Sequence, residues 1–548
     1  MLPTNLRRLH ESRCGSPVDG LFLRTWGTSV RRVGIACAAL ACSAHPEGDR
    51  RIPDVTATPS GAPVFLSGPT LTENPVAEAP LSWRLEAKID RPTTISVAVS
   101  DAFDAWARGP WAVDGTLDVW LQRWHPGETH TVVVTATDNR GLATSATLEV
   151  TAPPLPADFP DIRFVSADPV RMAPGYTVFS PSHTGPEAPQ YLTAYDENGL
   201  PVWWYAAKDT VYSIERTADG VRYLWGRDAL YEVDLQGNRI GEWTTRTPTE
   251  GGLAVDLPAM HHDVLTLPDG HLLALTIEGR NLPLFPLSEA EPSVQGPAFV
   301  AGDVIAEIDP DTGAILHEWP LLDLLDETRI GYDALASVYW EALFGEPTED
   351  WSHGNALAYD PGKDRIWVSL RHQDAVVGFG RTSGALEAIV GSGANWRAPW
   401  ASALFALDGG TWMYHQHGIN LGPNGTLFAF DNGNNGASPP SPRVPTVVSR
   451  AVEYALDEST RTVEERWSYA DPRGFFAGEM GNVQYLPAAE TVLVNFGAIK
   501  RKLPEDPTVV ILEVTHEAPP RVVFEINVYP PSIEQDKTVF RAHRWEEF

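Results

Sequence analysis

The sequence predicts an all-β protein, and two observations support this prediction. From about residue 64 to the end of the chain, short segments alternate apolar and polar residues, and turns rich in Gly, Asp and Asn separate them. Alternation of this kind is typical of strands, because successive side chains of a strand lie on opposite faces of the sheet. The chain has 548 residues, too many for one ordinary hydrophobic core, so we expect two folded domains.

The first folded domain is expected at residues 64–155. The segments "PLSWRLEAKIDRPTTISVAVSD" and "THTVVVTATDNRGLATSATLEVTA" alternate strictly, and turn residues interrupt them. Several short strands without cysteine predict a small β-sandwich similar to fibronectin type III and immunoglobulin-like domains. The proline-rich segment "PPLPADFP" ends this domain.

The second domain is expected at residues 160–548, where one pattern recurs at irregular intervals. It consists of an apolar strand, a turn with glycine and a second strand, as in "YLTAYDENGLPVWWYA", "VIAEIDPDTGAILHEWPL" and "INLGPNGTLFAFDNG". Such repetition without matching helices predicts a β-propeller, because radial closure protects strand edges that an open sheet would expose. We count six blades, with five or seven as the alternatives. The helical stretch "LLDLLDETRIGYDALASVYWEALFG" is expected as an insertion on one face of the propeller.

Residues 1–42 are expected to be an export signal. The segment "VRRVGIACAALACSAHPEG" contains Arg31 and Arg32, an apolar run and then a small residue before Cys42. Cys42 fits the lipidated position of a bacterial lipoprotein signal, and a soluble-protein signal peptide is the alternative. Residues 43–63 are polar with scattered Pro and Gly and predict a flexible linker. We therefore expect an exported protein, located in the periplasm or anchored to the outer membrane by its N-terminal lipid alone.

Charge and cysteine usage exclude several classes of function. The chain has 72 acidic and 41 basic residues and a net charge of -31, so a nucleic-acid partner is not expected. Its three cysteines, Cys14, Cys37 and Cys42, all lie near the N-terminus. A zinc-thiolate site or a cysteine nucleophile is therefore not expected in the folded domains.

Three polar clusters stand at equivalent points of the repeated pattern. The segments "HHDVLTLPDGHLLAL", "HGNALAYDPGKDRIWVSL" and "HGINLGPNGTLFAF" each run from histidine through a strand and a glycine turn to a second strand. The inner strands of a propeller converge on a central channel, so these histidines are expected to meet there. The clusters contain His261, His262, Asp263, Trp351, His353, Asn355, Arg371, His372, His415 and His417.

Two kinds of chemistry suit histidines that converge on one channel. A metal-dependent hydrolase or lyase would use His262, His353 and His417 as ligands. Covalent group transfer would need one imidazole as nucleophile, another as proton donor, and cationic or amide donors for the anion in transit. Arg371 and Asn355 are such donors, and a guanidinium would repel a metal ion, so covalent transfer is favoured and no metal ligand is expected. A non-catalytic propeller that binds a partner or glycan at the cell surface is the third hypothesis.

The motifs of these clusters resemble those of the bacterial arylsulfate sulfotransferases, the family that works without phosphoadenosine phosphosulfate. The resemblance lies in "HHD" before "LPDG", in "DWSHGNAL", in "VSLRHQDAVV" before "GFGRTSG", and in "HQHG" before "PNGTLFAFDNG". It covers most of residues 160–500, and the expected sandwich is also similar to that family's N-terminal domain. The best-known members carry a disulfide near the active site, whereas this chain has no cysteine after Cys42.

The resemblance implies ping-pong transfer of a sulfuryl group from one phenol to another through a sulfohistidine. His417 would be the nucleophile, since it matches the family's "QH". His353 and Asn355 match the "HxN" element and Arg371 matches the "SxR" element; these residues would bind the sulfate oxygens and help the phenolate to leave.

One histidine of "HH" completes the implied set, and we favour His262 over His261. His261, His415 and Trp351 are expected to bind substrate together with Asn355. Among the many aromatic residues, Trp351 and Trp396 are the candidates for stacking on a phenol. The expected partners are phenolic sulfates and phenols, and no cofactor is expected. The oligomeric state stays open, with a homodimer as one option.

Overall fold

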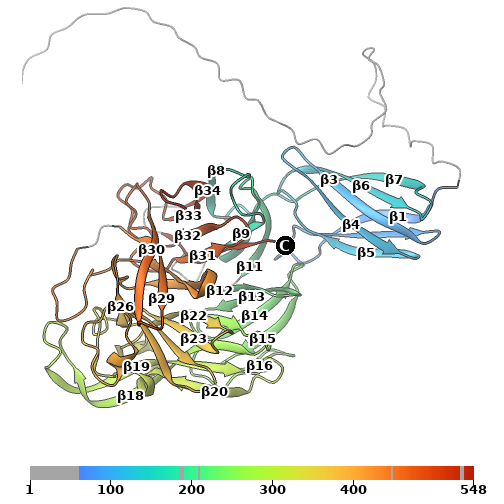
Figure 1. Ribbon diagram of the computed structural model, residues 1–548. Helices are drawn as coiled ribbons and strands as arrows, with labels where there is room; N and C mark the ends of the chain where they lie inside the picture. Colours follow the sequence, from blue (N-terminus) through green and yellow to red (C-terminus); the bar gives the residue numbers. More distant parts are fainter. Residues whose placement is uncertain (1–60, 184–189, 208–209, 446–447, 531–535) are drawn as a thin grey trace, which may run out of the picture. The chain divides into compact units, whose positions relative to one another are not determined.

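The computed structural model describes residues 61–183, 190–207, 210–445, 448–530 and 536–548. This part of the chain is built almost entirely of β-strands (Figure 1), which confirms the predicted all-β class. It belongs to one compact unit. The predicted export signal, Cys42 and most of the predicted linker lie outside the described residues. No helix among the described residues is long and apolar enough to cross a membrane.

The first seven described strands form two antiparallel sheets, drawn in blue and cyan in Figure 1. Strict alternation along β3 sends Ile95, Val97 and Val99 into the core between them. One sheet contains β1 (Phe65–Glu73), β2 (Trp83–Ile89) and β5 (Thr116–Leu121), and the other contains β4 (Ala105–Val113), β3 (Thr93–Ser100), β6 (Thr129–Thr137) and β7 (Ala143–Thr151).

The remaining strands form six sheets within the described residues, and none of them is closed on itself. The first three sheets in chain order contain β35 (Lys537–Trp545), β9 (Tyr176–His183), β10 (Gln190–Tyr195) and β11 (Pro201–Ala207); β12 (Val211–Arg216), β13 (Gly220–Trp225), β14 (Ala229–Asp234), β15 (Arg239–Thr244) and β16 (Leu253–Ala254); and β17 (Val264–Thr266), β18 (Leu272–Pro286), β19 (Gln295–Ile308), β20 (Ile315–Pro320) and β21 (Glu349–Asp350).

The other three sheets complete the described strands. They contain β22 (Gly354–Asp360), β23 (Arg365–Leu370), β24 (Ala375–Gly380) and β25 (Leu386–Gly391); β27 (His417–Leu421), β28 (Leu427–Asp431), β29 (Arg450–Asp457), β30 (Thr462–Ala470) and β26 (Ala406–Leu407); and β31 (Asn482–Leu486), β32 (Thr491–Phe496), β33 (Val509–Thr515), β34 (Val522–Tyr529) and β8 (Asp161–Ala167).

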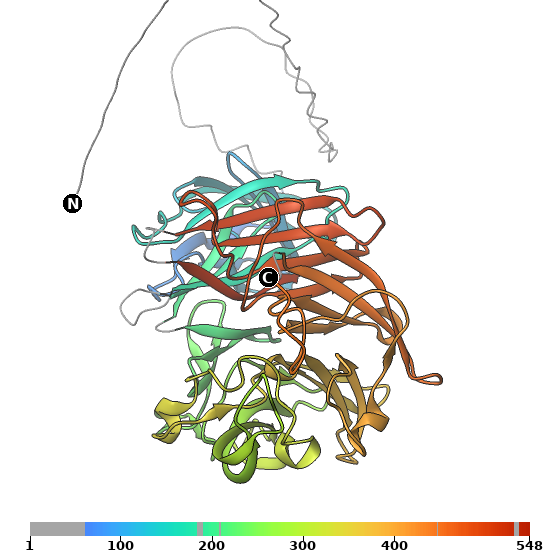
Figure 2. The same cartoon turned by 90° about the vertical axis from the view of Figure 1, so that its left-hand side faces the viewer.

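Strand order follows the chain within these sheets, apart from four pairings. The short strands β21 and β26 pair in parallel with β19 and β30. The other two pairings join the ends of the region. β8 pairs with β34, and β35 pairs with β9. The sheets follow one another in chain order, from teal through green and orange to red in Figure 2. In each sheet one edge strand, here called the first strand of that sheet, contacts the first strand of a neighbouring sheet. β35 contacts β12, β17 contacts β22, β22 contacts β27, β27 contacts β31, and β31 contacts β35. Ser213 of β12 bridges to the start of β17 by donating hydrogen bonds to Asp263 and to the main-chain oxygen of Val264.

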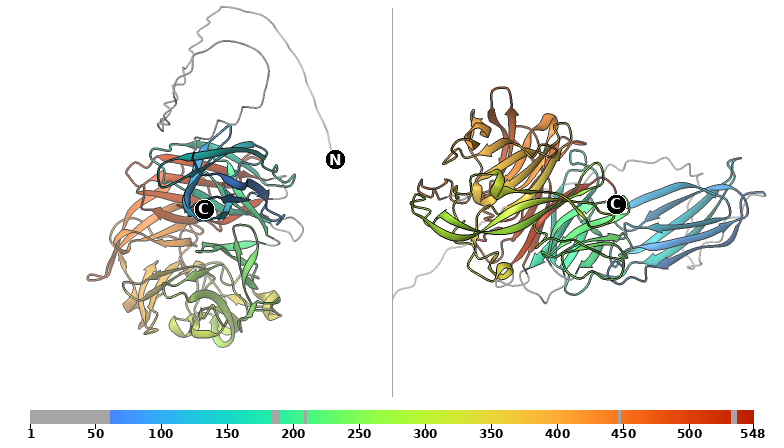
Figure 3. Two further views of the ribbon diagram at one scale, coloured as in Figure 1. Left: turned by 90° about the vertical axis from the view of Figure 1, so that its right-hand side faces the viewer. Right: turned by 90° about the horizontal axis from the view of Figure 1, so that it is seen from below.

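The segment between β20 and β21 is far less helical than the sequence predicts. It contains two single-turn helices, α1 (Leu321–Leu324) and α2 (Glu341–Phe344). The yellow-green and yellow part of the chain to which the segment belongs lies in the lower part of the left view in Figure 3. Between them Asp326 accepts hydrogen bonds from the main-chain and side-chain donors of Thr328, and Asp333 has a left-handed backbone with φ of 69°. These local turns compete with a helix and end it. Short 3-10 turns also occur at Arg371–Gln373, Trp400–Ala403 and Pro423–Gly425.

Candidate active site

A cavity of about 420 Å³ lies where the first strands of the six sheets meet. Each sheet contributes a side chain from its first strand or from the two residues before it: Phe540, Tyr212, His262, His353, His417 and Met480. Asp333, Ala336, Ser337 and Tyr339 line it from the segment between β20 and β21, and Arg371, His372 and Glu479 complete the lining. The four residues predicted to be catalytic, His262, His353, Arg371 and His417, therefore share one cavity.

A left-handed backbone recurs where the chain enters these first strands. His262 has a φ of 56° and His353 has a φ of 48°, a region that non-glycine residues rarely occupy. After His417 the left-handed position falls on Gly418, with a φ of 50°. A Cβ atom added there would lie 2.3 Å from the Cβ of Asn482, so only glycine fits at this position.

The hydrogen bonds of His417 fix its tautomer. Its Nδ1 lies 2.8 Å from Oδ1 of Asn432 and 3.2 Å from the main-chain oxygen of His415, and both partners are acceptors. The amide of Asn432 cannot be reversed without loss, because its Nδ2 donates to the main-chain oxygens of Ala477 and Met480. Nδ1 of His417 therefore carries the proton, and Nε2 keeps its lone pair.

The surroundings of His417 also keep this imidazole neutral. Burial lowers its pKa well below the ordinary histidine value, and the positive charge of Arg371 adds to the effect. Among the described residues, Nε2 of His417 has no hydrogen-bond partner. The cavity therefore presents an unprotonated nitrogen beside a guanidinium, an arrangement suited to attack on an anionic group.

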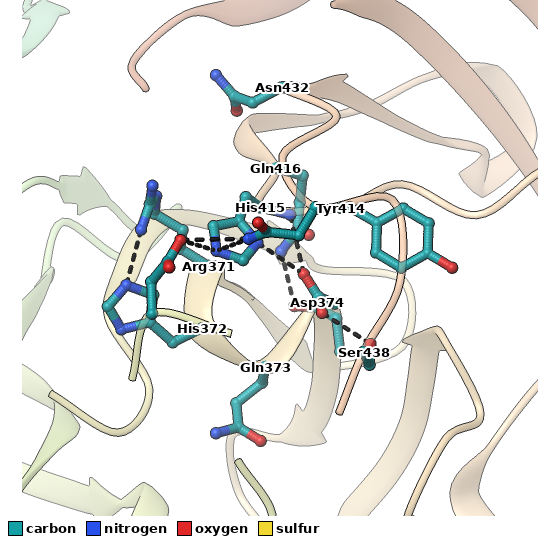
Figure 4. Close-up of polar contacts among 12 residues, drawn as sticks. Arg371, His372, Gln373, Asp374, Tyr414, His415, Gln416, Asn432 and Ser438 are labelled. Carbon is teal, nitrogen blue, oxygen red and sulfur yellow. Dashed lines mark hydrogen bonds and ion pairs between the residues drawn. The ribbon is translucent and has the colours of Figure 1, made fainter. Parts of the chain in front are cut away.

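His372 holds the guanidinium of Arg371 in place (Figure 4). Nδ1 of His372 donates to the main-chain oxygen of Asp350 at 2.6 Å, so its Nε2 is free to accept from Nη1 of Arg371 at 2.7 Å. Burial lowers the pKa of His372 well below its ordinary value, which agrees with a neutral acceptor ring. Arg371 is half-buried at the cavity wall, and its Nη2 lies 3.5 Å from the main-chain oxygen of Gly478. The guanidinium group of Arg371 is therefore held in a fixed position beside His417.

His353 belongs to a second histidine–carboxylate pair. Its Nδ1 donates to Oδ2 of Asp350 at 2.6 Å, and the same oxygen accepts from Oγ of Ser337 at 2.8 Å. Asp350 is buried; burial alone would raise its pKa, but His353, His372 and Ser337 outweigh it and lower the pKa of this carboxyl. With Nδ1 occupied, Nε2 is the nitrogen of His353 that is available to the cavity.

The structure distinguishes between the two histidines that the sequence left undecided. His262 lines the cavity, its ring centre 5.0 Å from that of His353, whereas His261 is fully buried behind it. The two rings are joined by a contact of 2.8 Å between their Nδ1 atoms. Burial lowers the pKa of His262 well below its ordinary value, and the nearby His261, His353, His417 and Arg541 add to the effect.

Asn355, His415 and Trp351, which were predicted to bind substrate, do not line the cavity. Nδ2 of Asn355 donates to the main-chain oxygen of Gln416 at 2.8 Å and so holds the residue before His417. Trp351 is fully buried in the hydrophobic core, with its Nε1 donating to the main-chain oxygen of Arg329. Trp396 also lies in that core, stacked against the guanidinium of Arg329 at 4.3 Å, so neither tryptophan is placed to stack on a ligand in this cavity.

His415 forms a buried ion-pair bridge. Its Nδ1 lies 2.9 Å from Oδ1 of Asp374 and its Nε2 lies 3.2 Å from Oδ2 of Asp333, so both nitrogens donate to carboxylates. Burial lowers the pKa of His415, but the hydrogen bonds to Asp333 and Asp374 outweigh it and raise the pKa above its ordinary value. Figure 4 shows Asp374 between His415 and Ser438. The bridge fixes Asp333 at the cavity wall.

Donor atoms that could hold a metal ion do not gather around His262, His353 and His417. In the part of the chain that the structure describes, such atoms approach within 4.8 Å of one another in two other groups: Asp350, His353 and His372; and Asp269, His271 and Glu307. Nε2 of His372 already accepts from Arg371 in the first group, and Arg381 pairs with two carboxylates of the second. A cation in either place would lie against a guanidinium.

Several residues of the site escaped the sequence analysis. Asn432 follows β28 in "FDNG", a segment that reads as a turn, and its bond to His417 depends on pairing between strands. The aromatic side chains of Tyr212, Tyr339 and Phe540 lie around His262, with ring centres 5.5, 5.5 and 5.6 Å away. No pattern of spacing separates these from the many other aromatic residues of the strands.

Comparison with known proteins gives the family. The family model described as arylsulfotransferase (ASST) matches residues 166–541. The arylsulfate sulfotransferase AssT of Escherichia coli O6:H1 is 29% identical over 287 residues, which cover 44% of this chain and 46% of that protein. The arylsulfate sulfotransferase AssT of Lelliottia amnigena is 27% identical over 284 residues, again 44% of this chain and 46% of that protein. The matches thus span less than half the length of these curated relatives.

Solved structures resemble the chain only weakly. Hydrazine synthase of Kuenenia stuttgartiensis has a TM-score of 0.30 and 12% identity, with 58% of this chain and 67% of that chain covered. A dihydro-heme d1 dehydrogenase has a TM-score of 0.30 and 10% identity, with 72% and 78% covered. At these scores the likeness says nothing about function. The match over residues 166–541 spans most of the sequence and contains every residue of the cavity, so the chain belongs to the arylsulfotransferase family.

Proposed function

We propose that this protein transfers a sulfuryl group from an aryl sulfate to a phenol in two steps, through a covalent sulfohistidine at His417. The observation that carries the proposal is the fixed tautomer of His417, whose Nδ1 proton is held by Asn432 while Nε2 is free beside Arg371. The family's name and the printed names of the curated relatives support the substrate class.

In the first step Nε2 of His417 attacks sulfur and the bond from sulfur to the phenolic oxygen breaks. The electron pair of that bond leaves with the phenolate. In the second step the oxygen of another phenol attacks the same sulfur, its hydroxyl proton passes to a base of the cavity, and the electron pair of the N–S bond returns to His417. Sulfuryl transfer is like phosphoryl transfer in depending mainly on positioning and charge stabilisation around an in-line displacement.

Arg371 is the proposed donor to the sulfuryl oxygens, and His353 is a second donor in its imidazolium form, with one proton on Nδ1 toward Asp350 and one on Nε2 toward the cavity. The guanidinium is held by His372, and the ring of His353 is held by Asp350, so neither has to reorganise when charge develops. Removing one donor from an oxyanion site costs about 3 kcal/mol. No diffusible cofactor is needed for this chemistry, because the aryl sulfate itself supplies the activated group.

Aromatic side chains of the cavity suit an aryl substrate. Tyr212, Tyr339 and Phe540 surround His262, and the ring centre of Phe540 also lies 6.4 Å from that of His417. Aromatic rings at these separations leave apolar faces and edges against which a phenol can pack. Phenolic sulfates and phenols are therefore the proposed substrates.

We also propose the finer architecture and the location. The succession of contacts between first strands and the pairing of β35 with β9 support a six-bladed β-propeller over residues 160–548. The two sheets of β1–β7 support a fibronectin type III-like sandwich over residues 64–155. The signal-like N-terminus supports export to the periplasm or to the outer membrane, with lipidation at Cys42.

Steady-state kinetics test the two-step mechanism. Release of 4-nitrophenolate from 4-nitrophenyl sulfate is measured at several concentrations of phenol as acceptor. A covalent intermediate predicts parallel lines in double-reciprocal plots, because the donor leaves before the acceptor binds. Lines that intersect would show that both substrates are bound together and would contradict the sulfohistidine route.

A further inference from the structure

The pair His261–His262 has an arrangement that the roles above do not use. Nε2 of His261 lies 3.1 Å from the main-chain oxygen of Thr276 and 3.2 Å from Oδ1 of Asp303, so this nitrogen carries a proton. Nδ1 of His261 faces Nδ1 of His262 at 2.8 Å, and one proton must lie between these two nitrogens. The charge on His261 decides which ring carries that proton.

Asp303 is the carboxylate that faces Nε2 of His261. This carboxylate is fully buried, and its Oδ2 is occupied by Oγ of Ser352 and by the main-chain nitrogen of Gly354 at 2.7 Å. Its Oδ1 has no hydrogen-bond partner among the described residues and faces His261. No lysine or arginine of the described chain pairs with Asp303, and a buried carboxylate needs a counter-charge. His261 is the group placed to supply it.

A protonated His261 sets the tautomer of His262. The cation donates from Nδ1 to Nδ1 of His262, so the neutral ring of His262 carries its own proton on Nε2. His262 lines the cavity, and its Nε2 has no hydrogen-bond partner among the described residues. The ring therefore presents an N–H donor to the same space as the lone pair of His417.

We propose that His261 and Asp303 form a proton store behind His262, which acts as the acid for the leaving phenolate and as the base for the incoming phenol. This inference rests on the proposed sulfuryl transfer and adds where its protons come from and go to. His262 is the catalytic residue of the relay, and His261 and Asp303 are positioning residues that act through it.

The relay balances in both steps. When the S–O bond breaks, the Nε2 proton of His262 moves to the phenolate oxygen and the Nδ1 proton of His261 moves to Nδ1 of His262. His261 is then neutral, with its remaining proton on Nε2. When the acceptor binds, its hydroxyl proton moves to Nε2 of His262 and the Nδ1 proton returns to His261, while the phenolate oxygen forms the new S–O bond.

The relay suits His262, because the surroundings of this ring disfavour its charged imidazolium form. The pKa of His262 is lowered, first by burial and then by the electrostatic effect of His261, His353, His417 and Arg541. Because one proton enters the ring as another leaves, His262 is neutral before and after each step. A lone histidine in this position would have to become an imidazolium to deliver a proton.

The leaving-group dependence of the first step tests the relay. Formation of the sulfo-enzyme from 4-nitrophenyl sulfate and from phenyl sulfate is followed by rapid quench and intact mass, with wild type and His261→Asn. Phenol has a pKa of about 10, like the tyrosine side chain, so it leaves poorly without a proton. We expect His261→Asn to slow the phenyl sulfate reaction about 100-fold, within the range of general acid catalysis. The 4-nitrophenyl sulfate reaction should slow by a much smaller factor, because nitrophenolate leaves unaided.

The ratio of the two rates is the decisive quantity, because inactive protein in a sample lowers both rates equally. Asp303→Asn should shift the ratio in the same direction. His271→Asn is the matched control, since this histidine pairs with Glu307 outside the cavity, and should keep the wild-type ratio. Wild-type ratios in both His261→Asn and Asp303→Asn would overturn the relay. A wild-type protein that forms no adduct with either ester would instead contradict the sulfuryl transfer itself.

Discussion

Nδ1 of His417 lies 2.8 Å from Oδ1 of Asn432, and this contact decides which nitrogen of the histidine can react. The asparagine is itself held by two main-chain oxygens, so the acceptor cannot rotate away. The lone pair of Nε2 is thereby available in the cavity with Arg371. An uncharged partner leaves the imidazole neutral, whereas a carboxylate would favour the imidazolium, which has no lone pair to attack with.

Replacement of Asn432 tests this positioning role. Asn432→Ala removes the acceptor and lets the ring of His417 adopt the other tautomer or rotate. A wrong histidine tautomer costs about 10⁴-fold in kcat in serine proteases, and we expect a loss of 10²- to 10⁴-fold in kcat here with a smaller change in KM. Asn432→Asp keeps an acceptor oxygen but favours the imidazolium, so it should retain more activity than Asn432→Ala only at a pH high enough to leave the ring of His417 neutral. Equal losses in both variants at that pH would show that the acceptor does not matter.

The activity should fall even when Arg371 is replaced by a residue that keeps the positive charge. Arg371→Ala removes the proposed oxyanion donor and should lower kcat by about 10²- to 10³-fold. Arg371→Lys keeps a positive charge but loses the planar fork and the fixed bond to Nε2 of His372, so we expect most of the loss to remain. The measurement is the rate of nitrophenolate release at saturating donor. Full activity in Arg371→Lys would mean that charge alone suffices.

The pH dependence of sulfo-enzyme formation should reflect the depressed pKa of His417. A nucleophile must be unprotonated, and burial with the nearby Arg371 keeps this ring unprotonated below the ordinary histidine pKa of about 6.5. The first-step rate with 4-nitrophenyl sulfate should therefore remain level from pH 8 to below pH 6.5 and fall only at lower pH. Intact mass after rapid quench measures this rate. A fall centred near the ordinary value would contradict the assigned environment.

His415 should matter for stability. His415→Gln leaves the buried Asp374 without its cation, and breaking a buried pair in this way costs about 3–5 kcal/mol in the free energy of unfolding. The wild-type stabilisation should be fully present below about pH 6.5 and should be lost as pH rises through the raised pKa of His415. Urea unfolding of wild type and variant at several pH values measures both effects.

Arg443 provides the control for His415. It pairs with Asp333 at 2.9 Å from the more exposed side, with 45% of its side chain accessible, so Arg443→Gln should cost about 1 kcal/mol or less. A loss for His415→Gln no larger than this would show that the buried bridge contributes little.

Histidines recur in the sequence at the same position relative to the repeated strands, and this regular position made the site predictable. His262, His353 and His417 stand at the entrances of β17, β22 and β27, and the structure brings all three to one cavity. Arg371 follows the second strand of its sheet and was identified by its chemistry and by the family motif. The all-β class followed from alternation and turn residues.

The orientation of the other side chains near the starts of these strands could not be predicted in the same way. Asn355 and His415 lie in the same motifs as the cavity residues, yet their side chains point to the main chain of Gln416 and to two carboxylates. Each of these two residues stands two positions from a cavity histidine, a spacing that a regular strand would place on the same face. The left-handed backbones at His353, His415 and Gly418 break this alternation, so spacing alone cannot separate a cavity residue from its support. Asn432 went unnoticed because strand pairing, and not a sequence motif, brings it to His417.

Intact mass of the purified protein after brief exposure to 4-nitrophenyl sulfate tests the central claim most directly, with His417→Ala as the matched variant. Fragmentation of the labelled peptide then locates the added group. We expect the wild-type protein to gain one sulfuryl group on His417 as nitrophenolate is released, and the variant to gain none. A wild-type protein that releases nitrophenolate without gaining mass, or a variant that still gains it, would contradict covalent transfer through His417.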